Sequence, residues 1–168
     1  MNNAFTDAYD EHINGVYGFF AYRVRCREDA EDLTQQTFER ALAAWSRYDP
    51  QRAPLGVWLL AIARNLLVDH YRTDRSARRR SLQDVEEGEL GSELAAPDLG
   101  VAPELAEALA TLSPRDREIV ALRFGGDLKG PEIAELTGLS LANVQQILSR
   151  SLRQLRGALD KTASSGRT

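Results

Sequence analysis

Two groups of polar side chains occur at helical spacing in this sequence. The first lies over residues 28–40, where carboxylate and amide side chains alternate with an apolar stripe. The second lies toward the C-terminal end, where amide, hydroxyl and guanidinium groups share one side of an expected helix. By periodicity, the first group is most simply a solvated helix face. The second has the residue types that read DNA bases and phosphates.

The second group belongs to a helix-turn-helix pattern. A helix over 131–137 is followed by Gly138, which permits a tight turn, and by Ser140, which caps a helix over 141–159. Glutamine can pair with adenine, serine can donate or accept, and arginine suits guanine or phosphate. Lys129, just before the motif, is placed for a phosphate. The predicted DNA-reading residues of the second helix are Asn143, Gln145, Gln146, Ser149, Arg150 and Arg153. The alternative is a generic three-helix bundle, or a motif used for protein contacts.

The overall charge does not argue against DNA binding. The chain of 168 residues has 21 Lys and Arg against 25 Asp and Glu, a net charge of -4. The charges are unevenly distributed, because the segment from Gly138 onward is basic and carries Asp160 as its acidic residue. Its basic residues are Arg150, Arg153, Arg156, Lys161 and Arg167. A basic C-terminal helix is the electrostatic pattern expected of a nucleic-acid interface.

The first group lies on an amphipathic helix expected from Asp29 to about Tyr48. Asp29 is placed to cap its start, with the Asp32 carboxylate three residues further on. The residues predicted to share the apolar face are Ala30, Leu33, Thr37, Phe38, Ala41 and Trp45. The residues predicted on the polar face are Glu28, Asp29, Asp32, Gln35, Gln36, Glu39 and Arg40.

Helical periodicity dominates the remaining chain and strand signals are almost absent, which predicts an all-α fold. Aromatic and apolar residues repeat at three- and four-residue spacing over 4–24. A loop with two prolines spans 49–56, and a strongly apolar helix follows over 57–72. The polar strip of that helix consists of Arg64, Asn65, Asp69 and Arg72.

These patterns predict two small helical domains joined by a flexible acidic linker. The segment 76–103 is acidic, contains glycine and is weakly periodic, which is typical of a linker. Helical signals resume near Pro103, and Ser113 with Pro114 marks the start of a further helix. The predicted division is a first domain over 1–75, the linker over 76–103, a second domain over 104–160 and a disordered tail over 161–168.

Several classes of protein are disfavoured by the composition. No apolar run is long enough to cross a membrane, and no secretory signal is visible, so we expect a cytoplasmic protein. Cys26 is the single cysteine, so no internal disulfide forms, and His12 and His70 cannot complete a zinc site. No nucleophile–base arrangement, metal spacing or phosphate loop is present, which argues against an enzyme and against a cofactor.

Three segments resemble one known family. The segment 29–41, Asp-Ala-Glu-Asp-Leu-x-Gln-x-Thr-Phe-x-Arg-Ala, closely resembles the polymerase-docking helix of bacterial sigma factors of the extracytoplasmic-function type. The segment 58–72 is similar to sigma regions 2.3 and 2.4. The segment 112–124, followed by Glu-Ile-Ala-Glu-Leu-Thr-Gly over 132–138, is similar to sigma region 4. Both domains match in the expected order, and the missing middle domain marks this class.

The resemblance implies a role in transcription initiation. It implies that the first domain binds the clamp helices of the largest subunit of core RNA polymerase, and that the second domain reads the -35 element while resting on the flap of the second-largest subunit. The loop over 46–56 and the strip of Arg64, Asn65, Asp69 and Arg72 are implied to contact the -10 element and trap a flipped base. The implied polymerase-binding residues are Asp32, Gln35, Gln36, Glu39 and Arg40.

The resemblance also assigns a role to the linker. Related linkers run through the active-site cleft and the RNA exit channel, where negative charge imitates nucleic acid. The residues that could do so here are Glu86, Glu87, Glu89 and Glu93. An anti-sigma factor is a common partner in this family, although no residue of this sequence identifies one.

One departure from the family concerns the recognition helix. The family commonly has Thr-Val-Lys/Arg-Ser-Arg, whereas this chain has Asn-Val-Gln-Gln-Ile over 143–147. Two positive charges are therefore missing where bases and phosphates are usually met. We expect an atypical -35 element, richer in A·T contacts, and weaker nonspecific DNA binding. The second hypothesis is a helix-turn-helix regulator that acts without polymerase, which explains 104–160 but not the first domain.

Overall fold

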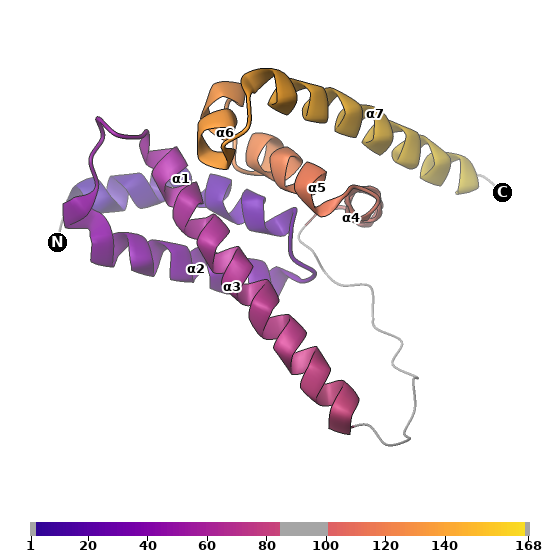
Figure 1. The fold of residues 1–168 in the computed structure, drawn as a ribbon, viewed down its shortest axis with the longest axis horizontal. Coiled ribbons are helices and arrows are strands. Elements are labelled where there is room, and N and C mark those ends of the chain that lie inside the picture. Colours follow the sequence, from indigo (N-terminus) through magenta and orange to yellow (C-terminus); the bar gives the residue numbers. More distant parts are fainter. Residues whose placement is uncertain (1–2, 85–100, 167–168) are drawn as a thin grey trace.

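The computed structural model describes residues 3–84 and 101–166, and the described part is helical with no strand. Figure 1 shows two groups of helices lying against each other. The first group comprises α1 (Asn3–Ala21), α2 (Arg27–Ala44), the 3-10 turn η1 (Trp45–Arg47) and α3 (Leu55–Asp84). The second comprises α4 (Pro103–Ala110), α5 (Pro114–Val120), the π-helical turn η2 (Ala121–Gly125), α6 (Gly130–Thr137) and α7 (Leu141–Ser165). The all-α fold expected from the periodicity is confirmed.

The first group is held by an aromatic and aliphatic core between its three helices. Phe19 and Phe20 near the end of α1 are fully buried, as are Leu59 and Leu60 in the first half of α3. From α2 the buried face supplies Ala30, Leu33, Thr34, Thr37, Phe38 and Ala41. The expected apolar face of α2 is confirmed, except that Trp45 lies just beyond the helix and is partly buried.

The second group forms the expected helix-turn-helix. Gly138 adopts a left-handed conformation with φ 73°, which a glycine reaches without a steric penalty, and it ends α6. The Ser140 hydroxyl then accepts a hydrogen bond of 3.1 Å from the Asn143 backbone N–H and caps α7. Ser113 caps α5 in the same way through Asp116 N–H at 3.2 Å. Both caps were predicted from the sequence.

The two groups of helices share one continuous core. Leu122, Leu128 and Ile133 of the second group belong to the same buried cluster as Phe19 and Leu60 of the first. A smaller cluster, formed by Ala108, Leu109, Leu112, Val120 and Leu155, lies within the second group. The chain is therefore folded back on itself, with η2 packed against α1 and α6 packed against α3 (Figure 1).

Two expected boundaries in the first group of helices differ from the structure. Cys26, not Asp29, is the N-cap residue of α2, and its side chain makes no capping hydrogen bond. Asp29 therefore lies in the first turn, where its charge still favours the helix N-terminus. The helix α3 continues to Asp84, through residues predicted as linker, because the segment contains no glycine or proline and Asp74 pairs with Arg78 at 3.4 Å.

The C-terminal end also differs. Residues 161–165 were predicted to be disordered, but they continue α7 to Ser165. The Thr162 hydroxyl donates to the Ala158 carbonyl at 3.1 Å, which satisfies a polar group within the last turns. The acidic residues Glu86, Glu87, Glu89 and Glu93 lie outside the described residues. No helix within 3–84 and 101–166 combines the length and apolar character that a membrane crossing requires.

The cap of α7 gives a first prediction. Replacing Ser140 by alanine removes the acceptor for the Asn143 N–H, and we expect the free energy of unfolding to fall by about 1 kcal/mol. Ser140→Gly is the matched comparison, since glycine at this position costs roughly a few tenths of a kcal/mol. Urea unfolding followed by far-UV circular dichroism measures both. Equal losses for the two variants would contradict the capping role.

Candidate nucleic-acid and protein interfaces

The exposed side of α7 presents most of the predicted DNA-reading residues. Val144, Ile147 and Ser151 face the interior, and they leave Gln145, Gln146, Ser149 and Arg153 exposed on the helix surface. Asn143 is partly buried beside the helix start. The structure therefore brings these residues together on the first turns of a helix that follows a tight turn, which is the arrangement that enters a major groove.

Arg150 is engaged within the protein. Its Nη2 donates to both carboxylate oxygens of Asp116 at 2.9 and 3.0 Å, which ties α7 to α5. The Asp116 side chain is largely buried, whereas that of Arg150 is 54% exposed. The arginine would have to release this partner, or share it, in order to bind a phosphate. Its role in DNA reading stays a prediction, and Asp116 is a partner that spacing did not indicate.

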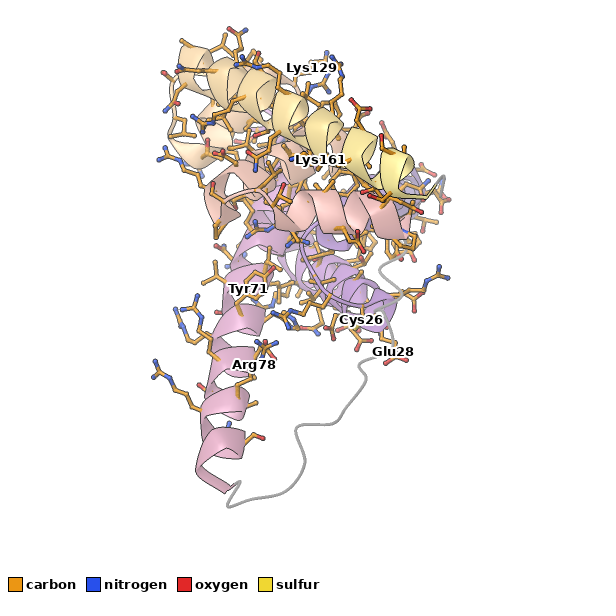
Figure 2. All side chains as sticks on the ribbon, turned by 90° about the vertical axis from the view of Figure 1, so that its right-hand side faces the viewer. Cys26, Glu28, Tyr71, Arg78, Lys129 and Lys161 are labelled. Atoms are coloured by element: carbon orange, nitrogen blue, oxygen red, sulfur yellow. The ribbon has the colours of Figure 1, made fainter. Side chains whose placement is uncertain are left out.

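Lys129 lies apart from the α7 set, directly before α6. Its backbone N–H donates to the Glu132 carboxylate at 2.7 Å, which stabilises the helix start, while its side chain is exposed. Figure 2 places Lys129 at the edge of the second group of helices, away from Tyr71 and Arg78 on α3. Its position leaves the ammonium group accessible to an anion.

The outward face of α2 carries the second set of predicted residues. Asp32, Gln35, Gln36, Glu39 and Arg40 are all exposed, on the side of α2 opposite its buried face. Gln35 donates to the Glu39 carboxylate at 2.9 Å, so this face is partly ordered by its own contacts. A shallow groove between α1 and α2 borders it and is lined by Tyr9, Phe38 and Leu42 among others. The face thus combines hydrogen-bonding groups with an apolar border.

The predicted polar strip of α3 is divided by the structure. Asn65, Asp69 and Arg72 are exposed and share one side of the helix. Arg40 approaches Asp69 at 3.9 Å from α2, a solvent-exposed pair of little energetic value. Arg64 lies on a different side and points into the second group of helices, where it contacts Glu118 of α5.

Arg64 makes a full set of contacts there. Its Nε and Nη2 donate to the two Glu118 carboxylate oxygens at 2.8 and 3.3 Å, and its Nη1 donates to the Leu136 carbonyl at 2.9 Å. Both side chains of the ion pair are about one quarter exposed. The sequence did not indicate Glu118 as a partner, because a glutamate on the polar side of a helix carries no signal of a contact with a distant residue.

An aromatic cluster lies at the loop between α2 and α3. Trp45 stacks on Tyr48 with ring centroids 5.7 Å apart, and Tyr48 approaches Trp58 at 4.9 Å. The Tyr48 hydroxyl donates to the Ala53 carbonyl at 3.1 Å, which closes the loop. Burial, and secondarily Asp49, raises the pKa of Tyr48 above its usual value, so the phenol stays protonated and keeps this bond.

The described residues contain neither a cluster that could bind a metal ion nor a thiol with a lowered pKa. Within 3–84 and 101–166, no three or more His, Cys, Asp or Glu side chains are grouped so as to hold a metal ion. Cys26 is a partly buried free thiol, and burial raises its pKa above the ordinary value. A raised pKa lowers the thiolate fraction at neutral pH.

The fold and these surfaces define a two-domain helical protein with a helix-turn-helix in its C-terminal half. Comparisons with known proteins support this description. The family described as Sigma-70 region 2 matches residues 8–77, and the family described as Sigma-70, region 4 matches residues 103–155. The ECF RNA polymerase sigma factor SigX of Bacillus subtilis is 30% identical over 164 residues, which are 93% of this chain and 84% of SigX. This chain therefore belongs to the extracytoplasmic-function (ECF) sigma factors, which recognise promoters in transcription initiation.

Other relatives extend the comparison. The ECF RNA polymerase sigma factor BldN of Streptomyces coelicolor is 32% identical over 164 residues, and the match covers 96% of this chain and 62% of BldN. Among solved structures, the sigma factor RpoE of Bartonella quintana, in complex with the anti-sigma factor NepR, matches with a TM-score of 0.69 at 22% identity. That match covers 95% of this chain and 98% of RpoE, and it shows the fold. CnrH, in complex with the cytosolic domain of CnrY, matches with a TM-score of 0.64 at 26% identity, covering 95% of this chain and 89% of CnrH.

The buried carboxylate of Asp116 gives a second prediction. Asp116→Asn removes the charge that Arg150 binds and leaves a buried amide, and we expect the free energy of unfolding to fall by about 1–3 kcal/mol. Arg115→Ala, a change at an exposed position of α5, is the control and should cost less. Urea unfolding measures both. An Asp116→Asn variant as stable as the wild type would contradict the structural role of the pair.

Proposed function

We propose that this chain binds core RNA polymerase through the exposed face of α2 and directs it to promoters with -10 and -35 elements. The observation that supports this most strongly is the combination in one chain of that polar face with a helix-turn-helix. A DNA-binding motif accounts for promoter contact, and the α2 face, in a region that matches Sigma-70 region 2, supplies the surface for polymerase.

The polymerase contact is assigned to Asp32, Gln35, Gln36, Glu39 and Arg40. Because these side chains lie on one exposed face and mix acceptors with donors, they suit the polar surface of a helical partner. The proposed partner is the clamp-helix pair of the largest subunit. The second domain is proposed to rest on the flap of the second-largest subunit.

The -10 contact is assigned to the exposed part of α3 together with the loop before it. Asn65 and Arg72 can donate to bases or phosphates, and Asp69 can accept from a base amino group. The ordered rings of Trp45, Tyr48 and Trp58 border the loop, and aromatic rings repay the cost of an unstacked base by stacking. We therefore propose that a flipped base of the -10 element binds beside this loop.

The -35 contact is assigned to the first turns of α7. Gln145 and Gln146 are exposed where a recognition helix meets base edges, and glutamine pairs bidentately with adenine. Asn143, Ser149, Arg153 and Lys129 are proposed to contact neighbouring bases or phosphates. An anti-sigma factor is a further proposed partner, since the RpoE structure contains one. The competing function, an operator-binding regulator without polymerase, leaves the α2 face without a role.

Charge reversal on α2 tests the polymerase contact. The double variant Asp32→Arg/Glu39→Arg changes two exposed carboxylates without touching the core, so we expect it to fold normally and to bind core polymerase at least roughly tenfold more weakly. Asp10→Arg on the exposed surface of α1 is the control for added charge. Fluorescence anisotropy with labelled chain measures the affinity. Wild-type affinity in the double variant would exclude this face as the dock.

Glutamine substitution tests the -35 assignment. Gln146→Ala removes a bidentate donor–acceptor group, so we expect the preference for the native base at one -35 position to relax by about 1–3 kcal/mol. Gln154→Ala is the matched control, because its amide is bound to the Thr111 carbonyl at 2.8 Å. In vitro transcription with core polymerase over a promoter library gives the preference. An unchanged -35 preference in Gln146→Ala would remove this residue from the set of base readers.

A further inference from the structure

The second half of α3 extends beyond the core and presents a stripe of arginines. Figure 1 shows this part of the helix projecting away from the other described helices, and every residue from Arg75 to Ser81 is exposed. Residues 68, 72, 75 and 79 follow one another at spacings of four, three and four, so their side chains share one side of the helix. Arg72, Arg75 and Arg79 on that side form the arginine stripe.

The arginine stripe has no hydrogen-bond or ion-pair partner among the described residues. The neighbouring arginines differ, because Arg78 binds Asp74 at 3.4 Å and Arg80 donates to a backbone carbonyl one turn earlier at 3.4 Å. The next carboxylate toward the start of the helix, that of Asp69, lies 3.9 Å from Arg40. The stripe is therefore a line of guanidinium groups without a compensating charge, unlike the other polar sides of α3.

This arrangement of charge opposes the stability of the helix. Arg72 and Arg75 are three residues apart, and Arg75 and Arg79 are four apart, which are the spacings at which side chains are neighbours on a helix surface. Like charges at these spacings repel each other and destabilise a helix. A local choice that works against the fold is expected where the residues serve a ligand. The stripe therefore points to an anionic partner.

The position and length of the stripe favour the phosphates of duplex DNA. Arg72 belongs to the proposed -10 set, so the stripe continues that surface along α3. From Arg72 to Arg79 the helix rises roughly 10 Å, which matches about three nucleotides of one strand at roughly 3.4 Å each. Guanidinium groups bind phosphate oxygens bidentately. A depression of about 420 Å³ runs along the stripe, and Ser76 adds a hydroxyl donor to its lining.

The charge of the stripe complements a deficit on the recognition helix. The first turns of α7 carry the uncharged Gln145 and Gln146, and the guanidinium of Arg150 is held by Asp116. The surface that is proposed to read bases is therefore poor in groups that neutralise phosphates. Because phosphate contacts supply much of the affinity of a protein for DNA, a second basic surface on the same chain restores what α7 lacks.

We propose that the arginine stripe binds phosphates of the promoter duplex beside the -10 element and supplies a sequence-independent share of the affinity for DNA. The location beside the -10 element rests on the proposed function, whereas the binding of phosphate does not. The match to Sigma-70 region 2 ends at residue 77, so it does not extend to Arg79. Each contacted phosphate releases condensed counterions, so the stripe makes DNA binding depend more steeply on salt.

Neutralising two arginines of the stripe tests the proposal. Arg75→Gln/Arg79→Gln places good helix formers at two exposed positions, so the fold should be unchanged. Arg78→Gln/Arg80→Gln is the matched control, because it removes the same charge from the same turns of α3 and leaves the stripe intact. Fluorescence anisotropy of the full chain with a fluorescein-labelled duplex of mixed sequence, roughly 30 base pairs long, measures the affinity from about 50 to 200 mM salt.

We expect the slope of log K against log salt to become shallower by about 1.8 in Arg75→Gln/Arg79→Gln, since each lost phosphate contact removes roughly 0.9. The control should keep the wild-type slope. Equal losses in both double variants would mean that net charge alone sets the affinity, and this would overturn the proposal, as would wild-type slopes in both. A stripe variant that binds the duplex normally but binds core polymerase more weakly would assign the stripe to a protein partner, which also overturns the proposal.

Experiments with core polymerase separate this inference from the proposed function. On a promoter selected from the library, ethylation of individual phosphates should interfere with the wild-type chain at about three positions beside the -10 element, and the stripe variant should lose this interference. Interference that the variant retains would overturn the assigned location. If the wild-type chain fails to direct transcription while the change of slope stays confined to Arg75→Gln/Arg79→Gln, the proposed function is wrong and the phosphate-binding stripe stands.

Discussion

The close approach of Gly18 to Gly125 is the constraint on which the arrangement of this protein depends. Because the two backbones touch, the first half of α3 lies against η2 and α6, and the two domains share the core that contains Leu60 and Leu122. The same approach places Arg64 within reach of Glu118. The packing of the two groups of helices and the engagement of Arg64 both follow from two positions where a side chain is absent.

The surfaces that face outward in this arrangement are those assigned to partners. The polar face of α2 and the first turns of α7 are exposed in the closed chain, whereas Arg64 of the -10 set is engaged at the domain contact. The face proposed for polymerase is therefore accessible without any rearrangement of the two groups of helices.

The sequence predicted the local features and missed the long-range ones. Residue type and spacing predicted the turn at Gly138, the helix cap at Ser140 and the apolar face of α2. The structure contains all three features. The glycines of α1 lie within a helix rich in aromatic residues, and those of η2 lie at its end. Nothing local indicates that the two meet, because that contact joins residues more than a hundred positions apart. The extension of α3 to Asp84 was missed because a charged segment without an apolar stripe has weak periodicity.

The central claim is that the two groups of helices are packed against each other in the free chain, and a distance between rigid helices tests it most directly. Spin labels at Glu31→Cys on α2 and Lys161→Cys on α7, in a Cys26→Ser background, report the separation of the domains by pulsed electron resonance. Both sites are exposed, so labelling should not disturb the core. The account predicts one narrow distribution at short distance for the free chain. A broad distribution at long distances in the free chain would contradict it.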